Sequence, residues 1–199
     1  PLVADARGAA VTFTGSNATG AKIHAAVGLG RRVQLELGGK NPIIVLADAD
    51  LDAAATIVAR SSFSLTGQAC TGAGRILVDH RVHDDLVERV RALAAQYVLG
   101  PGDQPGVTMG PLIDDAAVAA MAEVVAAARA DGARVVCGGE PPSQPELARG
   151  CFLPPTILTD VDPTSKLARE EVFGPVIGFE RVDGLDEALA SANNTRYGL

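Results

Sequence analysis

The chain has 199 residues, of which 47% are hydrophobic, and its formal net charge is −7 at pH 7. This length accommodates one large domain, or one domain with part of another. An acidic chain lacks the excess of Lys and Arg that neutralises phosphates, so its composition argues against a nucleic-acid partner. No apolar run approaches the roughly 20 residues that cross a bilayer, so we expect no membrane segment.

Three cysteines, Cys70, Cys137 and Cys151, lie along the chain without a Cys-x-x-Cys pair or a Cys/His ligand spacing. Such a set indicates neither a disulfide framework nor a metal site, and the expected location is a reducing compartment such as the cytoplasm. The first residue is not Met, and no helix cap or polar tail closes the chain. We therefore expect an internal fragment of a longer protein, cut at both ends.

The first half of the chain alternates short apolar runs with Ala-rich stretches. Val11–Thr14 is rich in β-branched and aromatic residues, which favour a strand. Arg32–Leu37 alternates polar with apolar residues, which is the period of a strand with two distinct faces. In chain order we predict a strand at 11–14, a helix at 17–27, strands at 32–37 and 42–46, and a helix from a cap at Asp48 or Asp50 through Ser64.

The second half repeats this alternation after a loop at 67–70. Asp84–Val98 carries its apolar residues on one side, as an amphipathic helix does. Residues 138–150 are rich in Gly, Pro and polar side chains, which predicts a surface excursion. In chain order we predict a strand at 75–79, helices at 84–98 and 114–130, strands at 133–137, 156–158 and 176–179, and a helix at 185–193. Strands that alternate with helices predict an α/β fold with a largely parallel sheet.

Four motifs carry the residues on which chemistry can be argued: Phe13-Thr14-Gly15-Ser16, Glu36-Leu37-Gly38-Gly39-Lys40-Asn41-Pro42, Gly67-Gln68-Ala69-Cys70-Thr71 and Glu170-Glu171-Val172-Phe173-Gly174-Pro175-Val176. In this order they resemble the NAD(P)-dependent aldehyde dehydrogenase superfamily, and the resemblance covers essentially the whole chain. It implies an aldehyde dehydrogenase-like α/β fold, with a parallel-rich sheet and flanking helices. It also implies that residues 1–38 are the C-terminal tail of a dinucleotide-binding domain. Residues 39–199 would belong to the catalytic domain, incomplete at its C-terminus.

Cys70 is the candidate nucleophile. It lies in a loop after a helix, between the small residues Ala69 and Thr71, so a substrate has room to approach. The thiolate, rather than the thiol, attacks a carbonyl carbon. From the residues alone, a buried structural cysteine is the far commoner role. The resemblance implies that Cys70 forms a thiohemiacetal and then a thioester, and that its backbone N–H helps to hold the oxyanion.

Glu36 is the candidate general base. It ends an apolar strand directly before Leu37-Gly38-Gly39, where backbone and cofactor can come close. A thioester reacts slowly with neutral water, so a carboxylate is needed to take a proton from the attacking water. The alternation places Glu36 on the same face as Gln34, which is equally the pattern of a solvent-facing residue. The role of base is what the resemblance implies.

Gly15 and Ser16 end a strand and open a helix, where free backbone N–H groups and a positive helix end can hold a pyrophosphate. A plain helix cap by Ser16 accounts for the local sequence equally well. The resemblance favours contact of Gly15, Ser16 and Leu37 with NAD or NADP. It further implies that Glu171 binds the hydroxyls of the nicotinamide ribose, and that Phe173 packs beside the nicotinamide.

The remaining polar residues of these motifs are assigned no catalytic role. Lys40 follows the Gly-Gly pair, and we expect it to form a structural salt bridge. The three histidines, His24, His80 and His83, are expected on helix or loop surfaces, and none is a candidate catalyst.

The main hypothesis is oxidation of a small aldehyde to a carboxylic acid with NAD or NADP, followed by hydrolysis of the thioester. A semialdehyde is the narrower expectation for the substrate, and a homodimer or homotetramer for the whole protein. One alternative is a CoA-acylating relative, against which Glu36 counts because CoA then replaces water. Another is a cysteine hydrolase, which needs a His to activate Cys70. The third is a truncated chain that folds or binds a partner without turnover.

Overall fold

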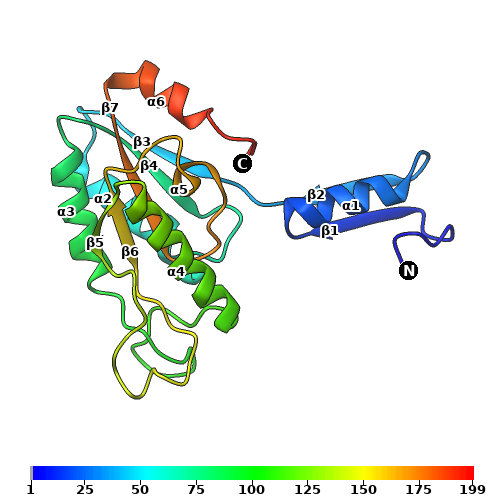
Figure 1. Ribbon diagram of the computed structural model, residues 1–199, viewed down its shortest axis with the longest axis horizontal. Coiled ribbons are helices and arrows are strands. Elements are labelled where there is room, and N and C mark those ends of the chain that lie inside the picture. Colours follow the sequence, from blue (N-terminus) through cyan, green and yellow to red (C-terminus); the bar gives the residue numbers. More distant parts are fainter. Residues whose placement is uncertain (1) are drawn as a thin grey trace.

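The computed structural model describes residues 2–199 and consists of a main body and a smaller unit, joined by an extended link (Figure 1). The small unit contains β1 (Ala10–Thr14), α1 (Asn17–Val27) and β2 (Arg32–Glu36). β1 and β2 pair in parallel. Both strands alternate exposed with half-buried residues, because one face packs on α1 and the other face is open. Residues 37–40 form the link to the main body.

The main body is built on a five-stranded sheet with the strand order β3-β4-β7-β6-β5. All neighbours pair in parallel except β5 and β6, which are antiparallel. The predicted α/β fold with a largely parallel sheet is therefore confirmed. The strands are β3 (Asn41–Val45), β4 (Ala73–Asp79), β5 (Arg134–Cys137), β6 (Thr156–Thr159) and β7 (Val176–Val182).

Helices cover both faces of this sheet (Figure 1). Ile76 and Val78 of β4 pack in the same apolar cluster as α2 (Leu51–Phe63) and α3 (His83–Ala94). Leu77, between them in the strand, points to the opposite face and packs with α6 (Gly184–Ala192). Burial on both faces explains why the central strands read as nearly continuous apolar runs. The second face is completed by α4 (Asp115–Ala130) and the short α5 (Lys166–Arg169).

Several helices begin where the sequence offers a side-chain oxygen to a free backbone N–H. Asp50 Oδ1 accepts hydrogen bonds from the backbone of Asp52 (3.0 Å) and of Ala53 (3.1 Å) at the start of α2. Asp114 Oδ1 accepts from Ala117 N at 2.8 Å at the start of α4. Such caps satisfy N–H groups that have no partner within the helix. Asp50, rather than Asp48, is thus the cap of α2.

The structure departs from the predicted elements in a few places. A short 3-10 turn at Ser64–Gly67 and the four-residue α5 are absent from the predicted elements. β7 continues to Val182 instead of ending at Phe179, and its two charged residues are both paired, Glu180 in the interior and Arg181 at the surface. Glu180 accepts a hydrogen bond from Ser191 Oγ at 2.6 Å, and Arg181 forms an ion pair with Asp84 at 2.7 Å.

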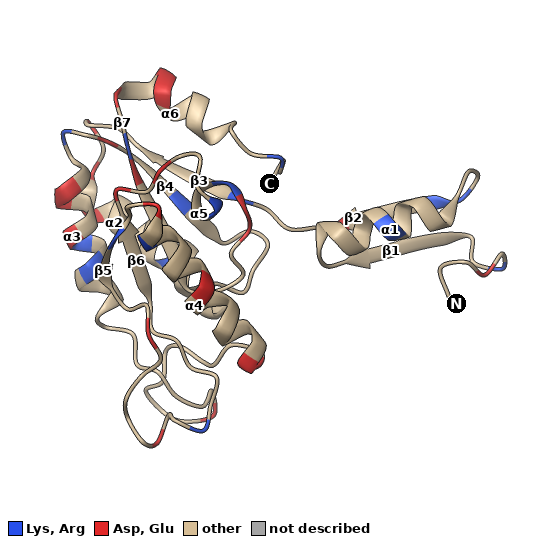
Figure 2. Cartoon of the chain, in the orientation of Figure 1, with Lys and Arg blue, Asp and Glu red and all other residues tan. Residues whose placement is uncertain are grey.

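Charged residues of both signs are interspersed over the main body and the small unit (Figure 2). No helix in residues 2–199 combines the length and the apolar character that a bilayer crossing requires.

Candidate active site

Three of the four motifs meet at one edge of the main sheet. Residues 37–40 precede β3, residues 67–72 precede β4, and residues 170–175 precede β7. Because β3, β4 and β7 are parallel neighbours, their amino ends lie at the same edge. The segments just before these strands are therefore brought together, although more than 100 residues separate the first from the last. The candidate site lies at this amino edge.

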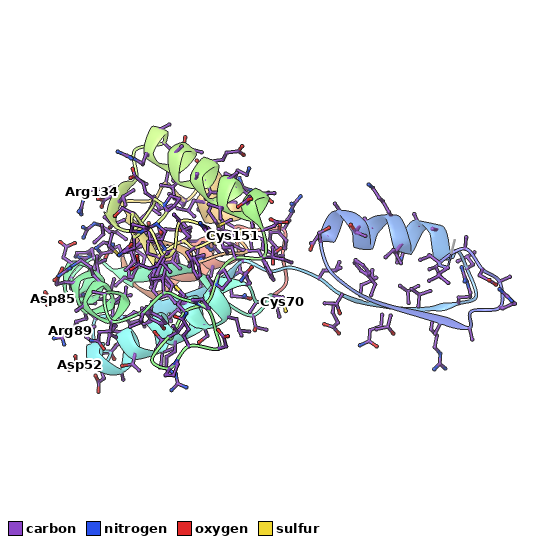
Figure 3. The ribbon with its side chains drawn as sticks, turned by 90° about the horizontal axis from the view of Figure 1, so that it is seen from below. Asp52, Cys70, Asp85, Arg89, Arg134 and Cys151 are labelled. Carbon is purple, nitrogen blue, oxygen red and sulfur yellow. The ribbon has the colours of Figure 1, made fainter. Side chains whose placement is uncertain are left out.

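Cys70 lies in the loop between α2 and β4, and it is half-buried. It lies on the side of the main body that faces the β1–α1–β2 unit (Figure 3). The 3-10 turn before it places Leu65 and Thr66 in the left-handed region, with φ of 53° and 59°. Such backbone costs about 1–3 kcal/mol for a residue with a side chain and is concentrated at functional sites. The Cys70 loop thus leaves α2 through a strained turn.

Side chains tie this strained turn to the loop that precedes α4. Thr66 Oγ1 donates to the carbonyl of Gly110 at 3.0 Å. Gln68 Oε1 accepts from Ile113 N at 3.0 Å, while its Nε2 donates to the carbonyl of Pro111 at 3.3 Å. Gln68 belongs to the Cys70 motif, but the sequence assigns it no role, since one sequence does not reveal a partner 45 residues away.

Glu171 lies against the Gly-Gly pair of the link. The N–H of Gly39 donates to Glu171 Oε1 at 3.3 Å. A Cβ atom placed on Gly38 would overlap the Glu171 carboxylate, so a larger residue there would displace the carboxylate from this position. The carboxylate is half-buried and keeps further acceptor capacity. The structure therefore joins the motif of Glu36 to the motif of Glu171.

Glu36 is the last residue of β2, and its side chain is exposed. Its carbonyl accepts from Gly15 N at 3.0 Å, and its carboxylate accepts from Gln34 Nε2 at 3.2 Å. Glu36 precedes Gly39 by three residues, so their Cα atoms are at most about 11 Å apart. Within residues 2–199 no hydrogen bond joins Glu36 to Cys70. The structure thus places Glu36 beside Gly15, at the end of the small unit where the link begins.

Gly15 and Ser16 are exposed at the amino end of α1. Ser16 Oγ accepts from Thr19 N at 3.3 Å, which is the helix cap considered from the sequence. Leu37 packs its side chain against Gly20 of α1. These residues lie on the small unit, whereas Cys70 lies on the main body. Phe173, in the loop before β7, exposes 48% of its surface.

The prediction that Lys40 forms a structural salt bridge is wrong. Lys40 is only 2% exposed, and its Nζ has no hydrogen-bond partner within the described part of the chain. Burial, together with the nearby Arg75 guanidinium, lowers the pKa of this ammonium group to about 7. The side chain turns inward beneath Gly74 of β4, which has no side chain to exclude it. No pattern around Lys40 in the sequence marks it as buried.

The prediction that all three histidines lie at the surface is also wrong for one of them. His24 and His80 are exposed as expected, but His83 is fully buried. Its Nδ1 lies 3.0 Å from Asp84 Oδ1 and its Nε2 lies 3.3 Å from Thr159 Oγ1. His80 and His83 follow the carboxyl end of β4, about 20 Å along the strand from its amino end. The arrangement places neither of them within reach of Cys70 as a base.

Comparison with known proteins decides the family. The sequence profile described as the aldehyde dehydrogenase family matches residues 1–199, the full chain. The chain belongs to the aldehyde dehydrogenase family. The resemblance inferred from the four motifs is therefore confirmed.

Individual relatives resemble this chain both in sequence and in fold. The chain is 42% identical over 190 residues to an alpha-ketoglutarate semialdehyde dehydrogenase of Haloferax volcanii, covering 95% of this chain and 39% of that protein. Betaine aldehyde dehydrogenase of Staphylococcus aureus, solved with NAD+, superposes with a TM-score of 0.96 at 32% identity, over 100% of this chain and 40% of that one. An NADP-dependent enzyme of E. coli superposes at 0.94 and 39% identity with the same coverage.

The chain thus spans about 40% of the length of these aldehyde dehydrogenases. These structural neighbours bind NAD+ or depend on NADP. The predicted fold class and the predicted enzyme family are both confirmed by these comparisons.

Proposed function

We propose that the whole protein oxidises an aldehyde to a carboxylic acid, with Cys70 as nucleophile and Glu36 as general base. The observation that carries this proposal is the meeting of three motif loops at one sheet edge. There Cys70 is half-buried and faces the β1–α1–β2 unit. Membership of the aldehyde dehydrogenase family supports the reaction type.

The residues around the link fit a nicotinamide dinucleotide. Gly15 and Ser16 are exposed at the amino end of α1, where a phosphate finds backbone N–H groups and the positive end of the helix dipole. The Glu171 carboxylate makes one long hydrogen bond to Gly39 and can accept others from ribose hydroxyls. The half-exposed ring of Phe173 offers a flat apolar surface. When bound, the cofactor supplies the acceptor for the hydride.

In the first half-reaction, the Cys70 thiolate attacks the aldehyde carbon. The new C–S bond forms as the carbonyl π electrons move to the oxygen, which gives a thiohemiacetal. The backbone N–H of Cys70 donates no hydrogen bond in residues 2–199, so it is free to stabilise the negative oxygen. Departure of hydride from the same carbon restores the C=O bond and leaves a thioester on Cys70.

In the second half-reaction, Glu36 takes a proton from a water molecule. The water oxygen attacks the thioester carbon, and collapse of the tetrahedral intermediate expels the Cys70 thiolate and releases the carboxylic acid. The Glu36 side chain is exposed, and within residues 2–199 its carboxylate accepts a hydrogen bond only from Gln34 Nε2, so it can turn toward the link. A CoA-acylating enzyme has no need of this base, and a cysteine hydrolase would need the histidine that this edge of the sheet lacks in residues 2–199.

We further propose that residues 1–38 complete a dinucleotide-binding domain and that residues 39–199 are part of the catalytic domain. The separate sheets on the two sides of the link support this division. For the substrate we propose a semialdehyde, in line with the Haloferax volcanii relative. A comparison of kcat/KM for a semialdehyde and for an uncharged aldehyde of equal length tests this choice.

The test of the proposed function is Cys70→Ala in the whole protein. We expect oxidation of aldehydes to be abolished while binding of NAD+ or NADP+ stays within a factor of a few, because only the nucleophile is removed. Cys137→Ala is the matched control and should keep its activity, since Cys137 ends β5, outside the three motif loops, and its thiol donates to the carbonyl of Pro155 at 3.7 Å. Retention of more than a trace of activity in Cys70→Ala would remove Cys70 from the mechanism.

A further inference from the structure

Asn41 places its side-chain amide against the loop that carries Cys70. It is the first residue of β3, and it is half-buried. Asn41 Nδ2 donates to the carbonyl of Cys70 at 2.8 Å and to the carbonyl of Gly72 at 2.9 Å. A primary amide has two N–H groups, so both are used on this one loop. Asn41 and Cys70 are 29 residues apart in the sequence, so the fold rather than the local chain brings them together.

Hydrogen bonds hold both peptide groups that flank Cys70. The carbonyl of Ala69 accepts from Gly72 N at 3.0 Å, and the carbonyl of Cys70 accepts from Asn41. Each peptide group is planar, so fixing its carbonyl also fixes the plane. The φ and ψ angles of Cys70 describe the rotation between these two planes. The directions of the Cys70 N–H and of its Cα–Cβ bond are therefore both set.

Thr66 and Gln68 anchor the loop before Cys70, but the residues after Cys70 have few other contacts from side chains. Thr71 is exposed, and Gly72 has no side chain to pack. The link residue next to Asn41 adds no support from its side chain, because Lys40 points into the core. Loss of the Asn41 amide would leave the carbonyls of Cys70 and Gly72 without this donor, and the second peptide plane would be free to rotate.

We propose that Asn41 is a positioning residue, which orients the backbone N–H and the thiol of Cys70 for attack on the carbonyl group. This inference rests on the proposed function and goes beyond it, because Asn41 acts on the reaction only through Cys70. Misplacement of a reacting group by about 1 Å can cost 100-fold in rate. Asn41 should therefore affect kcat much more than KM.

The test compares Asn41→Ala and Asn41→Ser with Asn193→Ala in the whole protein. Asn193 Nδ2 donates to the carbonyl of Leu189 at 2.8 Å, so this control loses the same kind of bond at the end of α6. We expect kcat to fall about 10- to 100-fold in Asn41→Ala, with KM within about threefold of the unmodified protein. Asn41→Ser keeps one short donor and should recover part of this loss. Asn193→Ala should leave kcat unchanged.

Hydrogen exchange of the peptide that spans residues 64–75 gives a second readout, which needs no activity. We expect faster exchange at Thr71 and Gly72 in Asn41→Ala and intermediate exchange in Asn41→Ser, which also serves if Asn41→Ala fails to fold. Unchanged exchange and unchanged kcat in both variants would overturn the inference. Equal losses in kcat, KM and thermal midpoint for Asn41→Ser and Asn193→Ala would overturn it as well. If the unmodified protein oxidises no aldehyde, the proposed function fails, and exchange alone decides whether Asn41 holds the loop.

Discussion

The backbone of Gly67, three residues before Cys70, packs directly against the carbonyl of Gly174 in the loop that precedes β7. Gly67 has a φ of 68°, in the left-handed region, and a Cβ atom there would overlap the Gly174 carbonyl. Glycine is therefore required at this position for two reasons: the backbone conformation and the close approach of the Gly174 carbonyl. This contact holds the segment of Cys70 beside the segment of Glu171 and Phe173.

We expect Gly67→Ala to destabilise the protein by about 2–4 kcal/mol, from the strained φ and the overlap together. Activity should also fall, because the two loops must move apart. Thermal unfolding of the whole protein measures the effect. Gly102→Ala is the control, since a Cβ atom there meets nothing within 4 Å and should change the midpoint little. Equal midpoints for the two variants would contradict this account of the Gly67 contact.

Glu36→Gln separates the two half-reactions. The first needs no base beyond the thiolate, whereas hydrolysis of the thioester needs a carboxylate to accept a proton. We expect one burst of NADH or NADPH for each active site, followed by turnover at least about 100-fold slower than in the unmodified protein. Stopped-flow absorbance records the burst, and mass spectrometry should find the acyl group on Cys70. Steady turnover at the original rate would show that another group activates the water.

The sequence predicted the position of nearly every strand and helix, because apolar periodicity and Gly breaks are local signals. Through the resemblance to a family, the segments of Glu36, Cys70 and Glu171 were also predicted to form one site; this stays a prediction, but the structure does bring residues 37–40, 67–72 and 170–175 together. The order of the strands in the sheet explains why these segments meet, because β3, β4 and β7 are parallel neighbours. No local pattern in the sequence encodes that order.

The burial of several polar residues could not be predicted from one sequence. Lys40, Arg75, His83 and Glu180 are at most 3% exposed, although their residue types are usually found at the surface. Arg75 donates to the carbonyls of Ser191 and Ala192 at 2.8 Å, more than 100 residues away. Such partners compensate burial only once the fold has brought them together. Lys40 has no such partner in the described part of the chain, and its inward turn depends on the space beneath Gly74, which exists only once β3 and β4 have paired.

The buried Lys40 should make stability depend on pH. Its pKa is about 7 in the folded chain, against 10.5 for a lysine in water, because burial disfavours the charged form. Between these values the unfolded chain binds more protons than the folded chain, so stability rises as the pH rises from about 7 to about 10.5. Below pH 7 both states are protonated, and the full cost of burying the charge applies.

Lys40→Met removes this cost and keeps much of the side-chain volume. We expect Lys40→Met to be more stable at pH 7, by at most a few kcal/mol. The difference from the unmodified protein should shrink toward pH 10.5. Denaturant unfolding of both proteins across this range measures it, and other titrating groups cancel in the comparison. A difference that stays constant with pH would contradict a Lys40 pKa near 7.

The last prediction concerns the 199-residue chain by itself. It spans about 40% of the length of its relatives, and its small unit contributes only two strands, each with an open face. Gly15, Ser16 and Glu171 then form only part of a cofactor site. Each missing hydrogen bond weakens binding by about 1 kcal/mol, and every 1.4 kcal/mol is tenfold in Kd. We expect no measurable dehydrogenase activity and no NAD+ binding at micromolar concentrations. Calorimetry with NAD+ on the purified chain is the measurement, and a micromolar Kd would mean that these residues hold a complete site.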